Sequence, residues 1–218
     1  MPLVYDHVTF DLDGTLVDSR ADLVASVNHV LRSLGLPELP RATVCAYIGE
    51  GVRRLMQRAL GRLHQDQLDP AFELFLTYYG AHLLDETRPY PGIVDTLAAM
   101  ADRGLWLSVL TNKPAALSRT ILDGLGLLPH FVAVIGGDSL PARKPDPAGV
   151  RYLLGLTRTR RERMLLVGDS TIDLHTARAA GIAFCGVAWG LAPQSLRAEA
   201  VQHFVEHPGS LLAILEPT

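Results

Sequence analysis

Short apolar runs recur along the chain and alternate with segments of helical periodicity. Runs of this length, bounded by turn residues, are typical of buried strands. We expect strands at about residues 6–11, 105–110, 131–135, 164–167, 182–187 and 202–205. We expect helices at about residues 92–103, 114–124, 147–156, 171–180 and 209–215. Strands that alternate with helices predict an α/β fold, in which a parallel sheet is covered on both faces.

A long helical segment interrupts this alternation after the first strand. Apolar residues recur at helical spacing within residues 18–35, 52–60 and 68–79, and Gly49-Glu50-Gly51 breaks the pattern. Apolar stripes of this kind are what a bundle of helices needs for its core. The sequence therefore predicts a helical domain at residues 17–86, inserted into a core formed by residues 1–16 and 87–218.

Polar residues follow four of the predicted strands at their carboxyl ends. In chain order these are Asp11-Leu12-Asp13, Thr111-Asn112-Lys113, Lys144-Pro145-Asp146-Pro147 and Gly168-Asp169-Ser170, with Asp173 four residues after Asp169. Each alone also fits a turn, a helix cap or a solvated charge. In parallel sheets, however, ligands bind beyond the carboxyl ends of the strands. Their shared position therefore favours a single functional site.

The residue types at this rim indicate a chemistry. Asp11, Asp13 and Asp169 offer hard oxygen ligands, which suit Mg²⁺ rather than a soft metal. Lys144 supplies a compact positive charge suited to phosphate, and the Thr-Asn pair supplies neutral donors. Carboxylates, Mg²⁺, a lysine and a hydroxyl around one point describe a phosphoryl-transfer site. Since the chain has no Walker loop for a nucleotide, we expect a small phosphate monoester as the phosphate donor.

Composition narrows the function further. Apolar residues make up 48% of the 218 residues and charged residues 20%, which predicts a packed core. A net charge of -3 gives no basic surface for nucleic acid, and no apolar run approaches the length of a membrane helix. The first residues lack the pattern of a signal peptide. Cys45 and Cys185 match no metal-binding spacing and favour reduced thiols, so we expect a cytoplasmic protein.

Four motifs, in this order along the chain, resemble those of the haloacid dehalogenase superfamily of phosphatases. They are Asp11-Leu12-Asp13-Gly14-Thr15, Thr111-Asn112, Lys144-Pro145 with Pro147, and Gly168-Asp169-Ser170-Thr171-Ile172-Asp173. The string that continues to Gly181, the helical insertion and Ile48-Gly49-Glu50-Gly51 look most like the phosphoglycolate phosphatase branch. The resemblance implies a Rossmann-like core with an inserted α-helical cap that closes over the site.

The resemblance also implies roles for individual residues. Asp11 would be the nucleophile and form an aspartyl-phosphate, while Asp13 would protonate the leaving oxygen and activate the hydrolytic water. Mg²⁺ would bind the Asp11 and Asp169 side chains and the backbone carbonyl of Asp13. The phosphoryl group would be held by Thr111, Asn112 and Lys144, with Asp173 as partner of Lys144 or as support for the metal. In the cap, Gly49, Glu50 and Gly51 form the candidate substrate loop, although a plain turn between helices also fits.

Several functions compete at this point. The leading hypothesis is a Mg²⁺-dependent phosphatase of a small phosphorylated metabolite, with 2-phosphoglycolate first. A sugar-phosphate mutase shares the four motifs, whereas a dehalogenase lacks the second aspartate of the pair. A receiver module that is merely phosphorylated has no helical cap. The sequence is compatible with a monomer or a homodimer. It favours a core position for Trp189 and a surface position for His175. We can assign a role to neither residue.

Overall fold

A parallel sheet forms the centre of the protein. The computed structural model describes residues 3–191 and 193–217. Within these ranges, six strands pair in the order β5-β4-β1-β6-β7-β8, and every pair is parallel. The strands are β1 (His7–Phe10), β4 (Trp106–Leu110), β5 (Ala133–Ile135), β6 (Met164–Gly168), β7 (Ala183–Val187) and β8 (His203–Val205). The predicted α/β fold is confirmed, and β1 lies inside the sheet.

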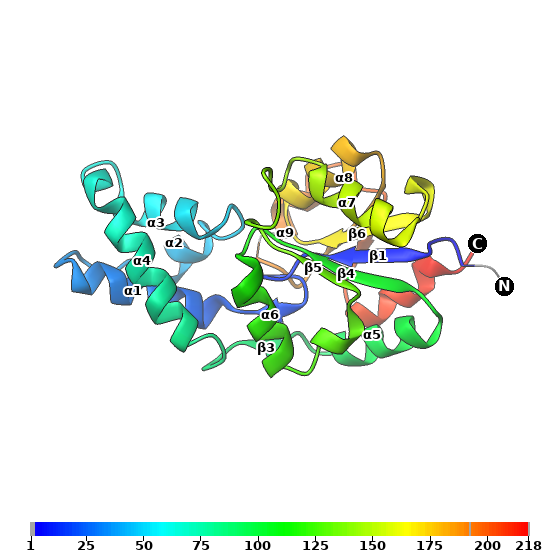
Figure 1. The fold of residues 1–218 in the computed structure, drawn as a ribbon, viewed down its shortest axis with the longest axis horizontal. Helices are drawn as coiled ribbons and strands as arrows, with labels where there is room; N and C mark the ends of the chain where they lie inside the picture. The colour runs from blue at the N-terminus through cyan, green and yellow to red at the C-terminus, as the bar shows by residue number, and fades with distance from the viewer. Residues whose placement is uncertain (1–2, 192, 218) are drawn as a thin grey trace.

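Helices cover both faces of this sheet (Figure 1). On one face lie α5 (Ile93–Asp102) and α6 (Ala115–Gly124), and on the other lie α7 (Ala148–Thr157) and α8 (Thr171–Ala180). Shorter elements are α9 (Pro193–Arg197) and the 3₁₀ helices η2 (Leu128–His130), η3 (Arg161–Arg163) and η4 (Pro208–Leu215). The predicted last helix is thus a 3₁₀ helix, and α9 was not predicted. Among the described residues, no helix combines the length and the apolar character that crossing a membrane requires.

The register of the sheet aligns the ends of its central strands. Phe10 at the end of β1 is level with Val109 of β4 and with Val167 of β6. The residues that follow these strands therefore emerge side by side at one rim. This alignment brings the motif after β1 next to the motifs after β4 and β6.

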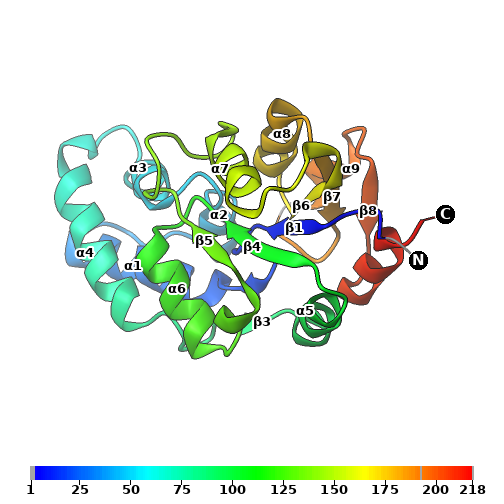
Figure 2. The ribbon, with the colours of Figure 1, turned by 45° about the vertical axis from the view of Figure 1, so that its right-hand side comes forward.

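The helices of residues 17–86, which we call the cap, lie together beyond this rim (Figures 1 and 2). They are α1 (Arg20–Ser33), α2 (Arg41–Cys45), α3 (Val52–Leu60), the 3₁₀ helix η1 (Gln65–Gln67) and α4 (Leu68–Ala81). The expected apolar stripes pack against one another, with Val27, Met56 and Phe75 fully buried. A short antiparallel ribbon of β2 (Val17–Asp18) and β3 (Arg88–Pro89), which the sequence pattern did not predict, carries the chain into the cap and back.

A buried carboxylate ties these two connections together. Asp22, in the first turn of α1, accepts hydrogen bonds from the backbone N–H groups of Glu86 (3.0 and 3.1 Å) and Thr87 (2.8 Å). It also accepts one from the Thr87 hydroxyl at 2.7 Å. Both oxygens are satisfied, as burial of a carboxylate requires. The chain therefore enters and leaves the cap through one joined segment.

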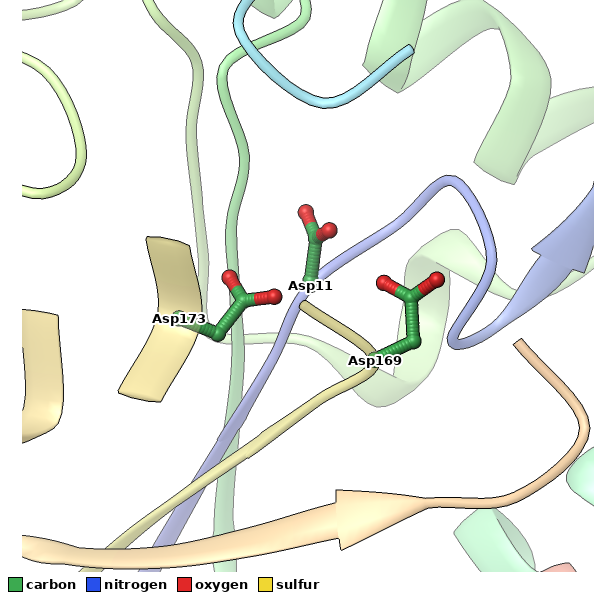
Figure 3. Close-up of side chains that lie close together, drawn as sticks. All are labelled: Asp11, Asp169 and Asp173. Atoms are coloured by element: carbon green, nitrogen blue, oxygen red, sulfur yellow. The ribbon is translucent and has the colours of Figure 1, made fainter. Parts of the chain in front are cut away.

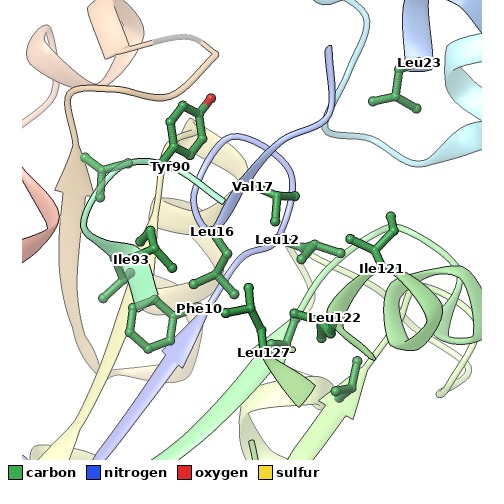
Figure 4. Close-up of a cluster of buried hydrophobic side chains, with 14 of the residues drawn as sticks. Phe10, Leu12, Leu16, Val17, Leu23, Tyr90, Ile93, Ile121, Leu122 and Leu127 are labelled. Carbon is green, nitrogen blue, oxygen red and sulfur yellow. The ribbon is translucent and has the colours of Figure 1, made fainter. Parts of the chain in front are cut away.

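The turn that follows β1 is anchored in the apolar core (Figure 4). Leu12, Leu16 and Val17 are fully buried and pack with Phe10 in the main cluster of the core. Between them, Gly14 adopts φ +88°, and a Cβ there would lie 2.3 Å from Oδ2 of Asp169. Only glycine fits this position without strain or collision. Burial on both sides of the turn thus fixes where the acidic residues of the first motif lie.

His7 on β1 should make stability depend on pH. The ring is fully buried, its two nitrogens contact Ser108 Oγ (2.8 Å) and Thr157 Oγ1 (3.1 Å), and burial lowers its pKa to about 4. The unfolded chain binds this proton near pH 6.5, so stability should fall as pH drops below that value. Between pH 7.5 and 5.0, wild type should lose about 2 kcal/mol of unfolding free energy more than His7→Gln. Urea unfolding of both proteins at both pH values measures the difference; an equal loss would contradict the prediction.

Candidate active site

Three aspartates meet at the rim where β1 and β6 end (Figure 3). Asp11 follows β1, Asp169 follows β6, and Asp173 lies in the first turn of α8. Each offers one carboxylate oxygen, and these oxygens lie within 4.8 Å of one another. All three side chains are buried. The parallel sheet therefore gathers carboxylates that are up to 162 positions apart in the chain (173 − 11).

Lys144 neutralises only part of this charge. Its Nζ lies 2.9 Å from Oδ1 of Asp11 and 2.5 Å from Oδ1 of Asp173. The other oxygen of Asp173 accepts hydrogen bonds from the backbone N–H (3.2 Å) and hydroxyl (2.6 Å) of Ser170, which caps α8. Burial raises the pKa of Asp11 to about 6 despite Lys144, and burial raises the pKa of Asp169 well above its usual value. Ionised carboxylates are thus costly here unless a further cation is present.

The donor set fits a hard divalent cation. Oδ2 of Asp169 accepts from the backbone N–H of Leu191 at 2.7 Å, and Oδ1 of Asp11 contacts Lys144. Within the described part of the chain, the remaining oxygens of Asp11 and Asp169 have no hydrogen-bond partner, whereas both oxygens of Asp173 do. Asp11 and Asp169 are therefore the side chains best able to bind a divalent cation, with Asp173 holding Lys144.

A second buried ion pair lies beside the first. Nζ of Lys113 is 2.6 and 2.8 Å from the two carboxylate oxygens of Asp13, and the Ser19 hydroxyl donates to Oδ1 at 2.5 Å. Lys113 and Lys144 are the chain's two lysines, and both have side chains only 2% exposed. The sequence interpretation did not include Lys113 in the site. Its position directly after the Thr-Asn motif was the available signal.

The cap covers this second ion pair. Tyr79 of α4 is fully buried, and Nζ of Lys113 lies 4.9 Å from the centre of its ring. Burial alone would lower the pKa of Lys113, but the Asp13 carboxylate more than compensates and holds it above its usual value. Burial raises the pKa of Tyr79 to about 12, and Lys113 opposes this rise. Lys113 therefore stays charged between a core carboxylate and a cap aromatic ring.

Asn112 connects three parts of the site. Its Nδ2 donates to the backbone carbonyl of Gly49 in the cap (3.0 Å) and to that of Lys144 (3.1 Å). Beside it, the hydroxyl of Thr111 accepts from the backbone N–H of Lys113 at 3.3 Å and keeps its own proton for another acceptor. The Asn112 side chain thus holds backbone segments together.

The candidate substrate loop lies close to the core backbone. Gly51 has φ +89°, and a Cβ there would lie 3.0 Å from the carbonyl oxygen of Asn112. Gly49 and Gly51 line the cavity above Asp11. Glu50 does not line it, because its carboxylate pairs with Arg58 and lies 3.7 Å from Arg54. The structure therefore brings the two glycines to the site and leaves the Glu50 side chain outside.

The cavity between cap and core is small and two-sided. The core side contributes Asp11, Asp13, Thr111, Asn112 and Lys113. The cap side consists of Leu23, Ile48, Gly49, Gly51, Val52 and Leu55. Its volume of about 30 Å³ holds roughly two waters. This space is smaller than a phosphate ester.

Two residues without an assigned role are also placed. His175 is exposed on α8, as expected. Trp189 is half-buried, packs against the main core cluster, and donates from Nε1 to the backbone carbonyl of Thr15 at 3.0 Å. Its contact with the first motif helps to hold the turn after β1.

Comparison with known proteins agrees with this geometry. Residues 8–187 match the sequence pattern of the haloacid dehalogenase-like hydrolases. The chain belongs to this family. The four motifs at the sheet rim and the inserted helices of residues 17–86 all lie within the matched range.

Individual relatives are similar over most of the chain. A phosphoglycolate phosphatase of Agrobacterium fabrum is 40% identical over 188 residues, which cover 83% of this hydrolase and 79% of that protein. One of Neisseria gonorrhoeae is 38% identical over 194 residues, covering 87% and 82%. A crystal structure from Haemophilus somnus, described as a predicted phosphoglycolate phosphatase, is 34% identical with a TM-score of 0.90, and the match covers 97% of this chain and 98% of that one.

Proposed function

We propose that this hydrolase is a phosphatase of a small phosphate monoester, with 2-phosphoglycolate as the leading substrate. One observation carries the proposal: the buried Asp11, flanked by Lys144 and Asp169, opens into the same cavity as a second carboxylate, Asp13. We assign Asp11 as the nucleophile and Asp13 as the proton carrier, because both carboxylates line this cavity. The names of the relatives in Agrobacterium fabrum and Neisseria gonorrhoeae support the substrate class.

The first step transfers the phosphoryl group to the protein. A carboxylate oxygen of Asp11 attacks phosphorus, and the bond between phosphorus and the ester oxygen breaks. Asp13 gives a proton to the departing oxygen, which leaves as an alcohol. Lys113 and the Ser19 hydroxyl hold the Asp13 side chain in place for this transfer. The product of the step is an aspartyl-phosphate on Asp11.

The second step hydrolyses this aspartyl-phosphate. Asp13, now ionised, takes a proton from a water molecule, whose oxygen attacks phosphorus. The bond between phosphorus and the Asp11 oxygen breaks, so that inorganic phosphate leaves and the carboxylate is restored. The apolar lining of the cap keeps other water away while the site is closed.

Positive charge and donors at the rim hold the phosphoryl group. Lys144 supplies the charge, the Thr111 hydroxyl and the Asn112 backbone N–H supply neutral hydrogen bonds, and Mg²⁺ would bind between Asp11 and Asp169. The bound cation would screen the repulsion between an anionic nucleophile and an anionic phosphate. Asp173 keeps Lys144 directed at Asp11 through its own contact at 2.5 Å.

We expect the protein to work in the cytoplasm, as a monomer or homodimer, without a nucleic-acid partner. Cys45 and Cys185 are free thiols, which agrees with a reducing compartment. Turnover on a small metabolite needs no macromolecular partner at the cavity.

Removal of divalent metal should stop turnover reversibly. With 2-phosphoglycolate and Mg²⁺, phosphate release should be catalytic, with many phosphates released per protein molecule. Excess EDTA should reduce the rate to background, because the carboxylates then repel the substrate, and excess Mg²⁺ should restore it. Phosphate release is measured colorimetrically over time.

Two controls make this test decisive. A mutase would move the phosphate within a sugar phosphate and release little, and a receiver would release one phosphate at most per molecule. Undiminished turnover in EDTA after metal removal would contradict the assigned metal site, and no release from any small ester would contradict the proposed function.

A further inference from the structure

The cavity offers very little positive charge to a substrate beyond its phosphoryl group. Its cap side consists of apolar side chains and glycine backbone. Of the residues that line it in the described structure, only Lys113 is a cation. Lys144 lies below the cavity, engaged with Asp11 and Asp173. Among the described residues that line the cavity, Lys113 is therefore the one cation available to a negative charge on the leaving group.

Lys113 is built to take an acceptor besides Asp13. An ammonium group has three N–H donors, and the two Asp13 oxygens use two of them. The third is available to the hydroxyl of Tyr79, which is buried without another hydrogen-bond partner among the described residues, or to a ligand in the cavity. A largely buried cation gains from every additional anionic or polar acceptor, since the small cavity admits few waters. Tyr79 closes the cap side, and its neutral hydroxyl supplies no negative charge to pair with the cation.

The position of Nζ matches one kind of leaving group. A proton donor must come within about 2.7 Å of the oxygen that it protonates. Nζ of Lys113 lies 2.6 and 2.8 Å from the oxygens of that donor, Asp13. The leaving oxygen is therefore within about 5.5 Å of Nζ, two hydrogen-bond lengths away. In a phosphorylated 2-hydroxy acid, a single carbon separates the ester oxygen from the carboxylate, so a carboxylate that points toward Lys113 can reach Nζ.

We propose that Lys113 binds the carboxylate of the leaving group and so selects phosphate esters of small 2-hydroxy acids. This inference rests on the proposed phosphatase function and adds to it the residue that recognises the alcohol. The apolar cap side chains then limit the size of that alcohol. The positive charge that selects the substrate therefore belongs to the core, although the cap closes the site.

A pair of substrates isolates the carboxylate. Ethyl phosphate has a methyl group where 2-phosphoglycolate has its carboxylate, and both have the same phosphoryl group. The measured quantity is the ratio of kcat/KM for 2-phosphoglycolate to kcat/KM for ethyl phosphate, with Mg²⁺ present. Lys113→Gln should lower this ratio by about 30-fold or more, as expected when one partner of a buried charge pair is lost. Lys113→Arg, which keeps the charge, should retain more of the ratio than Lys113→Gln.

A matched control removes a cation that does not line the cavity. Arg143 is exposed, and its guanidinium lies 3.3 Å from the place of a Cβ on Gly51. Arg143→Gln should keep the ratio within about threefold of wild type, because Arg143 does not line the cavity and water and salt screen its exposed charge. If Arg143→Gln lowers the ratio as much as Lys113→Gln, the selection is a general field effect and the inference is wrong.

The remaining outcomes separate this inference from the proposed function. If Lys113→Gln lowers kcat/KM equally for both esters, Lys113 acts only through Asp13, and the inference is overturned. If Lys113→Gln does not fold, the wild-type ratio of kcat/KM still tests the inference, since 2-phosphoglycolate must be preferred over ethyl phosphate by about 30-fold or more. A wild-type ratio near one overturns the inference while leaving the phosphatase intact, whereas hydrolysis of neither ester contradicts the phosphatase itself.

Discussion

Asp11→Asn should abolish turnover of 2-phosphoglycolate while the protein stays folded. The carboxamide has nearly the same shape as the carboxylate, but it cannot form a stable acyl phosphate. Loss of the attacking group in covalent catalysis costs on the order of 10⁴-fold or more in kcat. Steady-state phosphate release measures this loss, and acid quenching with a ³²P-labelled ester shows whether labelled protein forms.

Stability provides the control for this variant. In the absence of metal, the Asp11 carboxylate is buried next to Asp173, and its pKa is raised to about 6. Asp11→Asn removes a charge that destabilises the folded form above that pH, so its thermal midpoint without metal should not fall below that of wild type. A substantial residual rate, or label on another residue of wild type, would mean that the nucleophile lies elsewhere.

Asp13→Asn should slow turnover by two or more orders of magnitude. The Asp13 carboxylate lines the cavity, and the variant can neither donate nor accept the proton that each step requires. The variant should lower the rate constant of the first step less for p-nitrophenyl phosphate than for 2-phosphoglycolate, because a good leaving group depends less on protonation. A single-turnover burst with each ester measures the first step separately from hydrolysis.

Ser19→Ala is the matched control for Asp13. The Ser19 hydroxyl donates to Oδ1 of Asp13 at 2.5 Å but carries no proton in the reaction. Its removal should lower kcat less than tenfold, with the same loss for both esters. An effect of Asp13→Asn as small as this would argue for a mutase or a phosphoacceptor rather than a phosphatase.

Hydrophobic periodicity alone predicted most of the architecture. The order of strands and helices followed from the alternation of apolar runs, and the position of Asp11 and Asp169 at one rim followed from the parallel sheet. These features depend on local side-chain patterns, and a general rule of parallel sheets connects them. The ribbon of β2 and β3 was not predicted, because strands of two residues are too short to show an alternation of apolar and polar side chains.

The contacts that distinguish this site depended on tertiary structure. Lys113 pairs with Asp13 across 100 positions of sequence, and its cap neighbour Tyr79 has the same apolar spacing as any core residue. Glu50 lies in the expected loop but turns to Arg58, a direction that no spacing reveals.

The sequence by itself determined which residue types reach the end of each strand, because strand periodicity and burial are local properties. Only the tertiary structure decided which of these side chains pair with which, and which point into the cavity. Pairing depends on distances between segments that the chain brings together from far apart. Because burying an unpaired charge is costly, the folded chain adopts the arrangement in which each lysine is paired with a carboxylate.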